Sequence, residues 1–441
     1  MHGPDGFTAT GGSHESCVEP RRSTRRGGSI ECGQNENSPA FVTPNAPWAA
    51  TGYGQQCNQL ALRLRDAGHD VAISAFYGLQ GSVQVWEGIP VYPQGMHPYG
   101  NDVITAHAEQ HFGRLEDGLI ITLVDAWVLP TELLQEANVA MWTPVDHEPV
   151  PHRVVQALAK IGGTPIAMAR NGYDQLTAAG VQNVRYAPHG IDTDLMKPMD
   201  RDIARHRLGI PDEKSFVVGM VAANKGTPSR KGFSEAFQAF AAFSKKHPEA
   251  LLYLHTEVLG TVDGVNLVKL ALACGIDVDS VVPMHQYRGF ILGMPAEHMP
   301  YVYSACDVLL NPALGEGFGI PVVEAQACGT PVIVNDWTAM RELAGPGWKV
   351  EGQRFWTSQE SWGQTASVPA LIRALEGAWK KRGNQKLRDE CRKFALNYDA
   401  DRVFAEHWRP ILAELEDKLH RDPEPEPELE AAEPVVEVTA L

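Results

Sequence analysis

Short apolar runs alternate with amphipathic helical patterns between about residue 40 and residue 395. Runs of this length without internal polar positions are typical of strands that are buried on both faces. The strand-like runs of the first half are 41–46, 70–76, 118–124, 138–144, 164–168 and 184–188. Those of the second half are 215–222, 250–256, 280–285, 307–312 and 331–334, with a helix expected over about 232–246.

This alternation predicts the α/β class, with parallel sheets covered by helices on both faces. The series stops around 195–210 and then restarts, so we expect two doubly wound, Rossmann-like domains that face a central cleft. The first domain is predicted over 40–205 and the second over 206–398. Ligands of such sheets bind at the carboxyl ends of the strands, so the cleft should be lined by two facing sets of loops.

The C-terminal part of the ordered region holds one more helical pattern, over 401–419. We assign residues 399–420 to a C-terminal helix that could cross back to the first domain. Proline has no N–H to donate within a helix, so this helix should be interrupted or kinked at Pro410.

Composition separates the two ends of the chain from its middle. Residues 1–39 are rich in Gly, Ser and Arg, and residues 421–441 carry seven acids and one arginine in a Pro-Glu pattern. Such segments bury too little apolar surface to fold, so both tails are predicted to be disordered. The net charge of −16 argues against nucleic acid or an anionic membrane as the main partner.

Three features that the sequence does not show indicate the compartment: a transmembrane run, a signal peptide and paired-cysteine spacing. No apolar run reaches about 18 residues, so no transmembrane segment is expected, and the N-terminus does not resemble a signal peptide. The seven cysteines show no CxxC spacing. This favours reduced thiols and predicts a cytoplasmic protein.

The segment 314–334 (LGEGFGIPVVEAQACGTPVIV) places Glu316 and Glu324 in an otherwise apolar stretch. It leaves the strand-like run 307–312, and Pro321 is well placed at the start of a helix. The glycines between the two carboxylates allow a close backbone approach, and the free N–H groups of a helix start favour an anion. The alternative is that both glutamates only complement the helix dipole.

A second polar turn, NKGTPSRKGF (224–233), follows the strand-like run 215–222 and precedes a helix. Lys225 and Lys231 flank this turn, with Arg230 beside them. Lysines at the carboxyl end of a strand can hold phosphate as point charges. Basic turns are also common on surfaces, but together with an anion-ready helix start this one suggests a diphosphate site.

A third turn, with Gly52 and Gly54, joins the first strand to the first helix. A dinucleotide fingerprint would need a third glycine where Cys57 stands, and an acid at the end of a strand where Asp70 begins one. We therefore interpret the turn as a loop of close backbone approach and not as a nicotinamide site.

These segments resemble the retaining glycosyltransferases of the GT-B fold, in particular glycosyltransferase family four, also called glycosyl transferases group 1. The run from Glu316 to Glu324 resembles the E-x7-E motif within the family's EGFG-P-x-x-EA-x-A-x-G-x-PV pattern. RKGF (230–233) resembles the donor-phosphate lysine motif. The N-terminal matches are weaker: YAPHGIDTDLMKP (186–198) with the linker-proximal segment, and QLALRLRDAGHDV (59–71) with the first helix. The resemblance covers about residues 40–415.

The resemblance implies transfer of a hexosyl group, with retention, from a nucleotide-diphosphate sugar held by the second domain. Glu324 would accept hydrogen bonds from the ribose hydroxyls. Glu316 would bind hydroxyls of the donor sugar beside the backbone of Gly317, Phe318 and Gly319.

Lys231 would hold the phosphates, with Arg230 and the Gly52–Gly54 backbone close by. The family usually has an arginine where Lys225 stands, so charge is kept there but bidentate geometry is lost. A histidine of the first domain is usual near the reacting centre. His147 is the best match, with Asp146, Glu148 and His152 as rivals and a plain capping loop as the alternative.

No cofactor is expected, because the nucleotide-diphosphate sugar is the donor substrate. The Asp-x-Asp pairs at 192–194 and 277–279 do not fit a metal site beside the donor, and lysines with a helix dipole are available for the diphosphate. We therefore expect metal-independent transfer.

Other enzymes of the same fold (an epimerase or a phosphorylase), a non-catalytic nucleotide-sugar-binding relative and a nicotinamide oxidoreductase are the rival functions. The acceptor, which could be a glycan, a lipid, a small molecule or a protein, is not named by the sequence.

Overall fold

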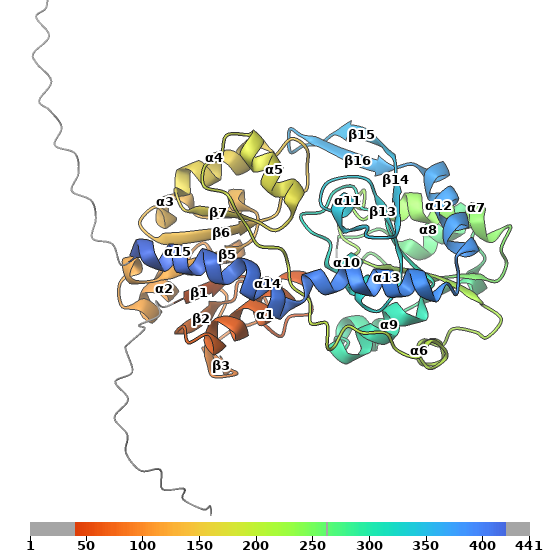
Figure 1. The fold of residues 1–441 in the computed structure, drawn as a ribbon, viewed down its shortest axis with the longest axis horizontal. Coiled ribbons are helices and arrows are strands. Elements are labelled where there is room, and N and C mark those ends of the chain that lie inside the picture. The colour runs from red at the N-terminus through yellow and green to blue at the C-terminus, as the bar shows by residue number, and fades with distance from the viewer. Residues whose placement is uncertain (1–39, 262, 420–441) are drawn as a thin grey trace, which may run out of the picture. The chain divides into compact units, whose positions relative to one another are not determined.

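The computed structural model describes residues 40–261 and 263–419 (Figure 1). The tails predicted to be disordered, 1–39 and 421–441, lie outside the described residues. These described residues belong to one compact unit. Within the described part of the chain, no helix is both long and apolar enough to cross a membrane.

The first domain is built on an eight-stranded sheet with the order β3-β4-β2-β1-β5-β6-β7-β8. Every pairing in it is parallel except β3 with β4. The strands are β1 (Ala40–Thr43), β2 (Val71–Ser74), β3 (Gln84–Trp86), β4 (Ile89–Tyr92), β5 (Leu119–Leu123), β6 (Asn138–Thr143), β7 (Thr164–Ala167) and β8 (Arg185–Tyr186).

The second domain is built on a six-stranded parallel sheet with the order β11-β10-β9-β12-β13-β14. A separate antiparallel hairpin, β15-β16, follows it. The strands are β9 (Phe216–Val221), β10 (Ala250–His255), β11 (Val281–Pro283), β12 (Val308–Asn311), β13 (Val332–Asn335), β14 (Trp348–Val350), β15 (Gly352–Trp356) and β16 (Trp362–Ala366).

Helices follow most strands and cover the sheets (Figure 1). Those of the first domain are α1 (Gly52–Asp66), α2 (Ile104–Phe112), α3 (Thr131–Leu134), α4 (His152–Ile161) and α5 (Arg170–Ala178). The later ones are α6 (Arg201–Leu208), α7 (Phe233–Ser244), α8 (Leu267–Cys274), α9 (Met299–Ala305), α10 (Ile320–Ala327), α11 (Met340–Leu343), α12 (Val368–Lys380), α13 (Gln385–Ala395), α14 (Ala400–Val403) and α15 (Arg409–Leu419).

The predicted fold class is confirmed, and each predicted strand overlaps an observed one. The reason is visible in β5, where Leu119 and Ile121 join one core cluster and Ile120 joins the cluster on the opposite face. A strand buried on both faces must be apolar throughout, and this is the pattern that the sequence shows. The antiparallel pairs β3-β4 and β15-β16 were not predicted: β3 and β15 are largely exposed, and the more buried β4 and β16 are short.

The C-terminal helical pattern is broken by a π-helical turn, Phe404–Trp408, between α14 and α15. The break therefore lies just ahead of Pro410, whose missing N–H weakens the helix at this point. In this turn Trp408 packs edge-on against Trp142 of β6, with 4.9 Å between the ring centroids. Part of the C-terminal helical segment is thus anchored on the first domain.

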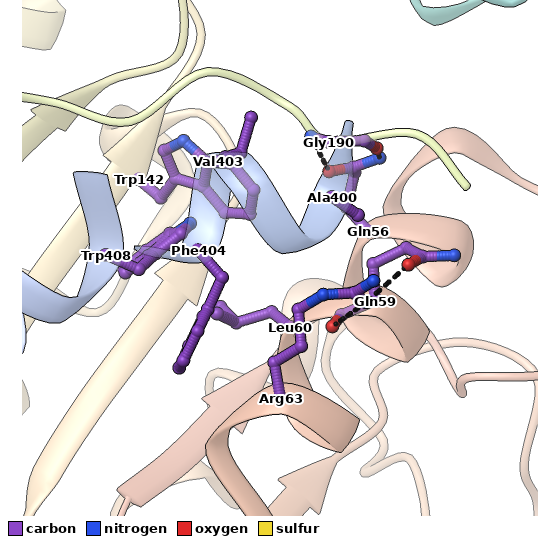
Figure 2. A pocket seen from close by; sticks show the side chains of 10 residues that line it. All are labelled: Gln56, Gln59, Leu60, Arg63, Trp142, Gly190, Ala400, Val403, Phe404 and Trp408. Atoms are coloured by element: carbon purple, nitrogen blue, oxygen red, sulfur yellow. Dashed lines mark hydrogen bonds between the residues drawn. The ribbon is translucent and has the colours of Figure 1, made fainter. Parts of the chain in front are cut away.

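A small pocket of about 20 Å³ marks the place where α1, the interdomain linker and this segment meet (Figure 2). The Gln56 side chain donates to the Gly190 carbonyl at 2.7 Å and accepts the Gly190 N–H at 3.1 Å. A Cβ at Gly190 would lie 2.8 Å from the Cα of Ala400. Position 190 of the linker therefore accommodates only glycine.

Candidate active site

The donor loop, which we define as residues 312–319, joins β12 to α10. It ends at Gly319, which precedes the helix with φ 116° and ψ 57°, a left-handed conformation that favours glycine. Pro321 lies in the first turn of α10, where its missing N–H leaves no helical bond unmade. These residues turn the chain sharply from the strand into the helix and present the loop at the carboxyl edge of the sheet.

Glu316 stands in the donor loop with 8% of its surface exposed. Its carboxylate forms an ion pair with the Lys231 ammonium, and its second oxygen lies 3.6 Å from Nη1 of Arg230. Its backbone N–H donates to the Thr338 hydroxyl at 3.0 Å. The carboxylate is therefore held by the 230–231 loop, and the backbone of Glu316 is held by Thr338.

Lys231 and Arg230 occupy the loop after β9, the strand beside β12. Burial lowers the pKa of Lys231, although its pairing with Glu316 opposes the shift. Arg230 is exposed, and the Glu316 charge raises its pKa. Gly232 follows with φ 67°, and a Cβ there would overlap the Pro312 carbonyl. Only glycine lets this loop pass so closely over the end of β12.

Lys225 begins the same loop but does not join this cluster. Its side chain is exposed, and its ammonium group makes no hydrogen bond or ion pair with any described residue, while its backbone N–H donates to the Ala223 carbonyl. The structure therefore brings Lys231 and Arg230 to Glu316 and leaves Lys225 apart.

Glu324 lies in α10 with 5% of its surface exposed. One carboxylate oxygen accepts a hydrogen bond from the Tyr303 hydroxyl at 2.5 Å, and the other accepts from Nε2 of Gln55 at 2.6 Å. Burial raises the pKa of Glu324, while the two hydrogen bonds oppose this shift. Gln55 belongs to α1 in the first domain, so one of these bonds joins the two domains.

The first domain contributes His147 and Asp146 from the loop after β6. The Asp146 carboxylate accepts from Nδ1 of His147 at 2.6 Å. Burial alone would raise the pKa of Asp146, but the hydrogen bond from His147 and the charges of His147 and Arg230 outweigh it and lower that pKa. A Cβ at Gly315 would overlap the carbonyl oxygen of Asp146, so this loop packs directly against the loop that carries Glu316.

Asp125 is a site residue that the sequence analysis missed. It follows the end of β5, which lies between β1 and β6 in the sheet. Burial and the charge of Asp146 raise the pKa of Asp125 to about 6, and Arg230 acts in the opposite direction. Burial raises the pKa of the Tyr53 hydroxyl too, and the charges of Asp125 and Asp146 add to this shift. The first domain thus contributes the carboxylates of Asp125 and Asp146, and the second contributes the cations Lys231 and Arg230 together with Glu316.

Three of the predicted donor-binding glycines are explained by packing within the protein. A Cβ at Gly54 would overlap the Ala49 carbonyl, and one at Gly317 would overlap Pro144. A Cβ at Gly52 would lie 3.3 Å from Cδ1 of Ile320. Their contact with a donor stays a prediction.

Phe318 turns its side chain away from solvent. It is 3% exposed and stacks on His189, with 5.0 Å between the ring centroids and an interplanar angle of 16°. Burial lowers the pKa of His189 to about 3, so this imidazole is neutral. His189 of the linker therefore packs against Phe318 of the donor loop on the side that is turned away from solvent.

Asp125→Asn is expected to stabilise the protein by about 2–3 kcal/mol at pH 8 and to change its stability little at pH 4. The folded-state pKa of about 6 lies above the ordinary value of 3.8, so the folded protein binds this proton more tightly than the unfolded chain. Stability is therefore lost as the pH rises from about 4 through 6, and asparagine removes that loss. Urea unfolding of the wild type and the variant at both pH values measures this difference in stability. An equal stabilisation at pH 4 and pH 8 would contradict the prediction.

Residues 200–395 match the protein family described as Glycosyl transferases group 1. A D-inositol 3-phosphate glycosyltransferase of Stackebrandtia nassauensis is 33% identical over 164 residues, which are 36% of this chain and 34% of that protein. The chain spans about a third of the length of the curated relatives that it matches first.

Two solved structures are similar over most of the chain. Sucrose-phosphate synthase from Thermosynechococcus elongatus aligns with a TM-score of 0.63 and 18% identity, covering 86% of this chain and 98% of that one. Anabaena Alr3699/HepE in complex with UDP-glucose aligns with a TM-score of 0.61 and 18% identity, covering 86% and 99%. Residues 200–395 are therefore similar to the glycosyl transferases group 1 family, and the chain that carries them has the two-domain GT-B fold.

Proposed function

We propose that the protein is a metal-independent, retaining glycosyltransferase that moves a hexosyl group from a nucleotide-diphosphate sugar to an acceptor. The observation that carries this proposal is the cluster of Glu316, Lys231 and Arg230 at the carboxyl edge of the second sheet. It combines a carboxylate for sugar hydroxyls with two cations for a diphosphate, opposite the His147–Asp146 pair of the first domain.

The donor would lie along this edge. Glu316 would accept hydrogen bonds from the sugar, and Lys231 and Arg230 would balance the charge of the diphosphate. The positive end of the α10 helix dipole would add to this favourable charge. Glu324 would receive the ribose hydroxyls.

Transfer breaks the bond between the anomeric carbon and the diphosphate oxygen and forms a bond from that carbon to the acceptor oxygen. The electron pair of the broken bond goes to the diphosphate, and the acceptor hydroxyl passes its proton to a leaving phosphate oxygen. Preorganised cations aimed at the growing negative charge lower the barrier of this step. His147 would orient the sugar or the acceptor from the first domain, with Asp146 holding its imidazole.

A panel of nucleotide sugars tests the proposal. HepE was solved with UDP-glucose, so UDP-sugars lead the panel, followed by GDP- and ADP-sugars. Release of the nucleotide diphosphate is measured with and without candidate acceptors, and the anomeric configuration of the product is read by NMR. Retention is expected, and an inverted product or turnover of no donor would contradict the proposal.

Donor turnover is expected to persist in excess EDTA. The side chains of Lys231 and Arg230 already supply positive charge where a diphosphate would lie, so a divalent cation is not needed there. The check is the rate of nucleotide release in EDTA and in Mg²⁺. Loss of activity in EDTA that Mg²⁺ restores would rule out metal independence.

A further inference from the structure

The first turns of α1 and α10 face each other across the two domains. Gly52 in α1 lies against Ile320 in α10, where a Cβ would already be 3.3 Å from Cδ1 of the isoleucine. One turn further along each helix, Gln55 donates its amide N–H to Glu324 at 2.6 Å. The seam therefore consists of an apolar contact followed by a charge-assisted hydrogen bond.

Both oxygens of the Glu324 carboxylate are in use within the protein. Tyr303 holds one and Gln55 holds the other, and 5% of the residue remains exposed. A carboxylate has further lone pairs, but burial covers them here. A ribose hydroxyl can therefore reach Glu324 only if one of the two partners leaves.

The two partners differ in how easily they can leave. Tyr303 is fully buried in α9 of the same domain, so it can move away only if the core opens. Gln55 is half-buried and comes from the other domain. The amide is thus the exchangeable partner, and the tyrosine is the positioning residue that stays.

We propose that Gln55 is an autoinhibitory contact, which occupies the ribose-binding oxygen of Glu324 and is displaced when a nucleotide binds. This inference rests on the proposed function, since it takes the ribose of a nucleotide donor as the competing ligand. Ribose hydroxyls then replace the amide on the same oxygen. Nucleotide binding thereby breaks one hydrogen bond between the domains and loosens the seam.

The exchange has a measurable cost. A hydrogen bond to a charged group must be broken before the ribose can form its own, so the amide weakens apparent nucleotide affinity. Removing the amide should therefore tighten binding. Gln55→Ala is expected to bind the nucleotide diphosphate roughly three- to tenfold more tightly than the wild type. Gln55→Asn, whose shorter side chain cannot span the same distance, should act in the same direction.

Gln59→Ala provides the matched control. Gln59 has the same side chain one turn further along α1, but its amide oxygen accepts from Arg63 of the same helix at 2.6 Å (Figure 2). Among the described residues, no hydrogen bond joins it to α10, so its removal should leave nucleotide affinity unchanged. Calorimetric titration with UDP, GDP and ADP gives the affinities of the wild type and of each variant.

A double-mutant cycle tests whether Gln55 acts through Glu324. Glu324→Ala should weaken nucleotide binding, and adding Gln55→Ala to it should then bring no further change. Equal or weaker binding by Gln55→Ala and Gln55→Asn, or the same gain in the Glu324→Ala background, would overturn the inference alone. If neither the wild type nor the variants bind any of the three nucleotides, the proposed function fails and the inference falls with it.

Discussion

Glu316→Gln is expected to slow sugar transfer on the order of 100- to 1,000-fold without weakening nucleotide binding. The carboxylate would hold the donor sugar, and its charge matters most when positive charge develops on that sugar. Glutamine keeps the shape of the side chain but removes the charge. Lys231 then loses its partner and becomes more available to a diphosphate, so nucleotide affinity should be unchanged or higher.

Initial rates of nucleotide release and calorimetric titration of the nucleotide diphosphate separate these two effects. Glu297→Gln, at an exposed position outside the site, is the control for loss of one negative charge. A fall in nucleotide affinity that matches the fall in rate would show that Glu316 serves binding and not transfer.

Lys231→Met is expected to weaken binding of the nucleotide diphosphate by roughly tenfold or more, while Lys225→Met should weaken it by less than about threefold. Lys231 is enclosed beside the donor loop, whereas Lys225 is exposed and lies outside the cluster. A charge near a buried site is screened less than one in water, so Lys231 should have the larger effect.

The nucleoside without phosphates is the discriminating probe. If Lys231 binds phosphate, the variant should lose affinity for the diphosphate and keep its affinity for the nucleoside. Methionine retains the apolar stem but leaves Glu316 without its buried cation, so Lys231→Met should also be made with Glu316→Gln to keep the fold. Equal losses for Lys231→Met and Lys225→Met would contradict the distinction between the two lysines.

The sequence predicts the elements well where one physical constraint dominates. Strands such as β5 and β9 are buried on both faces. An apolar run of that length is most simply assigned to a buried strand. The hairpin β15-β16 has exposed tryptophans at both strands, so its pattern does not separate it from a loop. The strand β3 has the same difficulty, because it is short, exposed and at the edge of its sheet.

For the candidate site too, the sequence predicts some features and leaves others to the tertiary structure. Glu316 and Lys231 could be predicted because each lies in a loop that leaves a recognisable strand, with glycines beside it. That they meet depends on the pairing of β9 with β12, which puts residues 85 positions apart side by side. Asp125 could have been proposed from its place after β5, but nothing in the pattern indicates that Asp146 would lie close to it.

By itself, the sequence determined the alternation of strands and helices and the places of Glu316 and Lys231 in loops that follow strands. A strand that is buried on both faces requires a continuous apolar run, and the start of a helix favours proline and glycine, so both can be recognised from neighbouring residues. The tertiary structure alone decided which partners those residues have: Gln55 and Tyr303 on Glu324, and an exposed Lys225 apart from Lys231. Such contacts join segments that are far apart in the chain, and their geometry depends on strand order and domain packing, which hydrophobic periodicity does not specify.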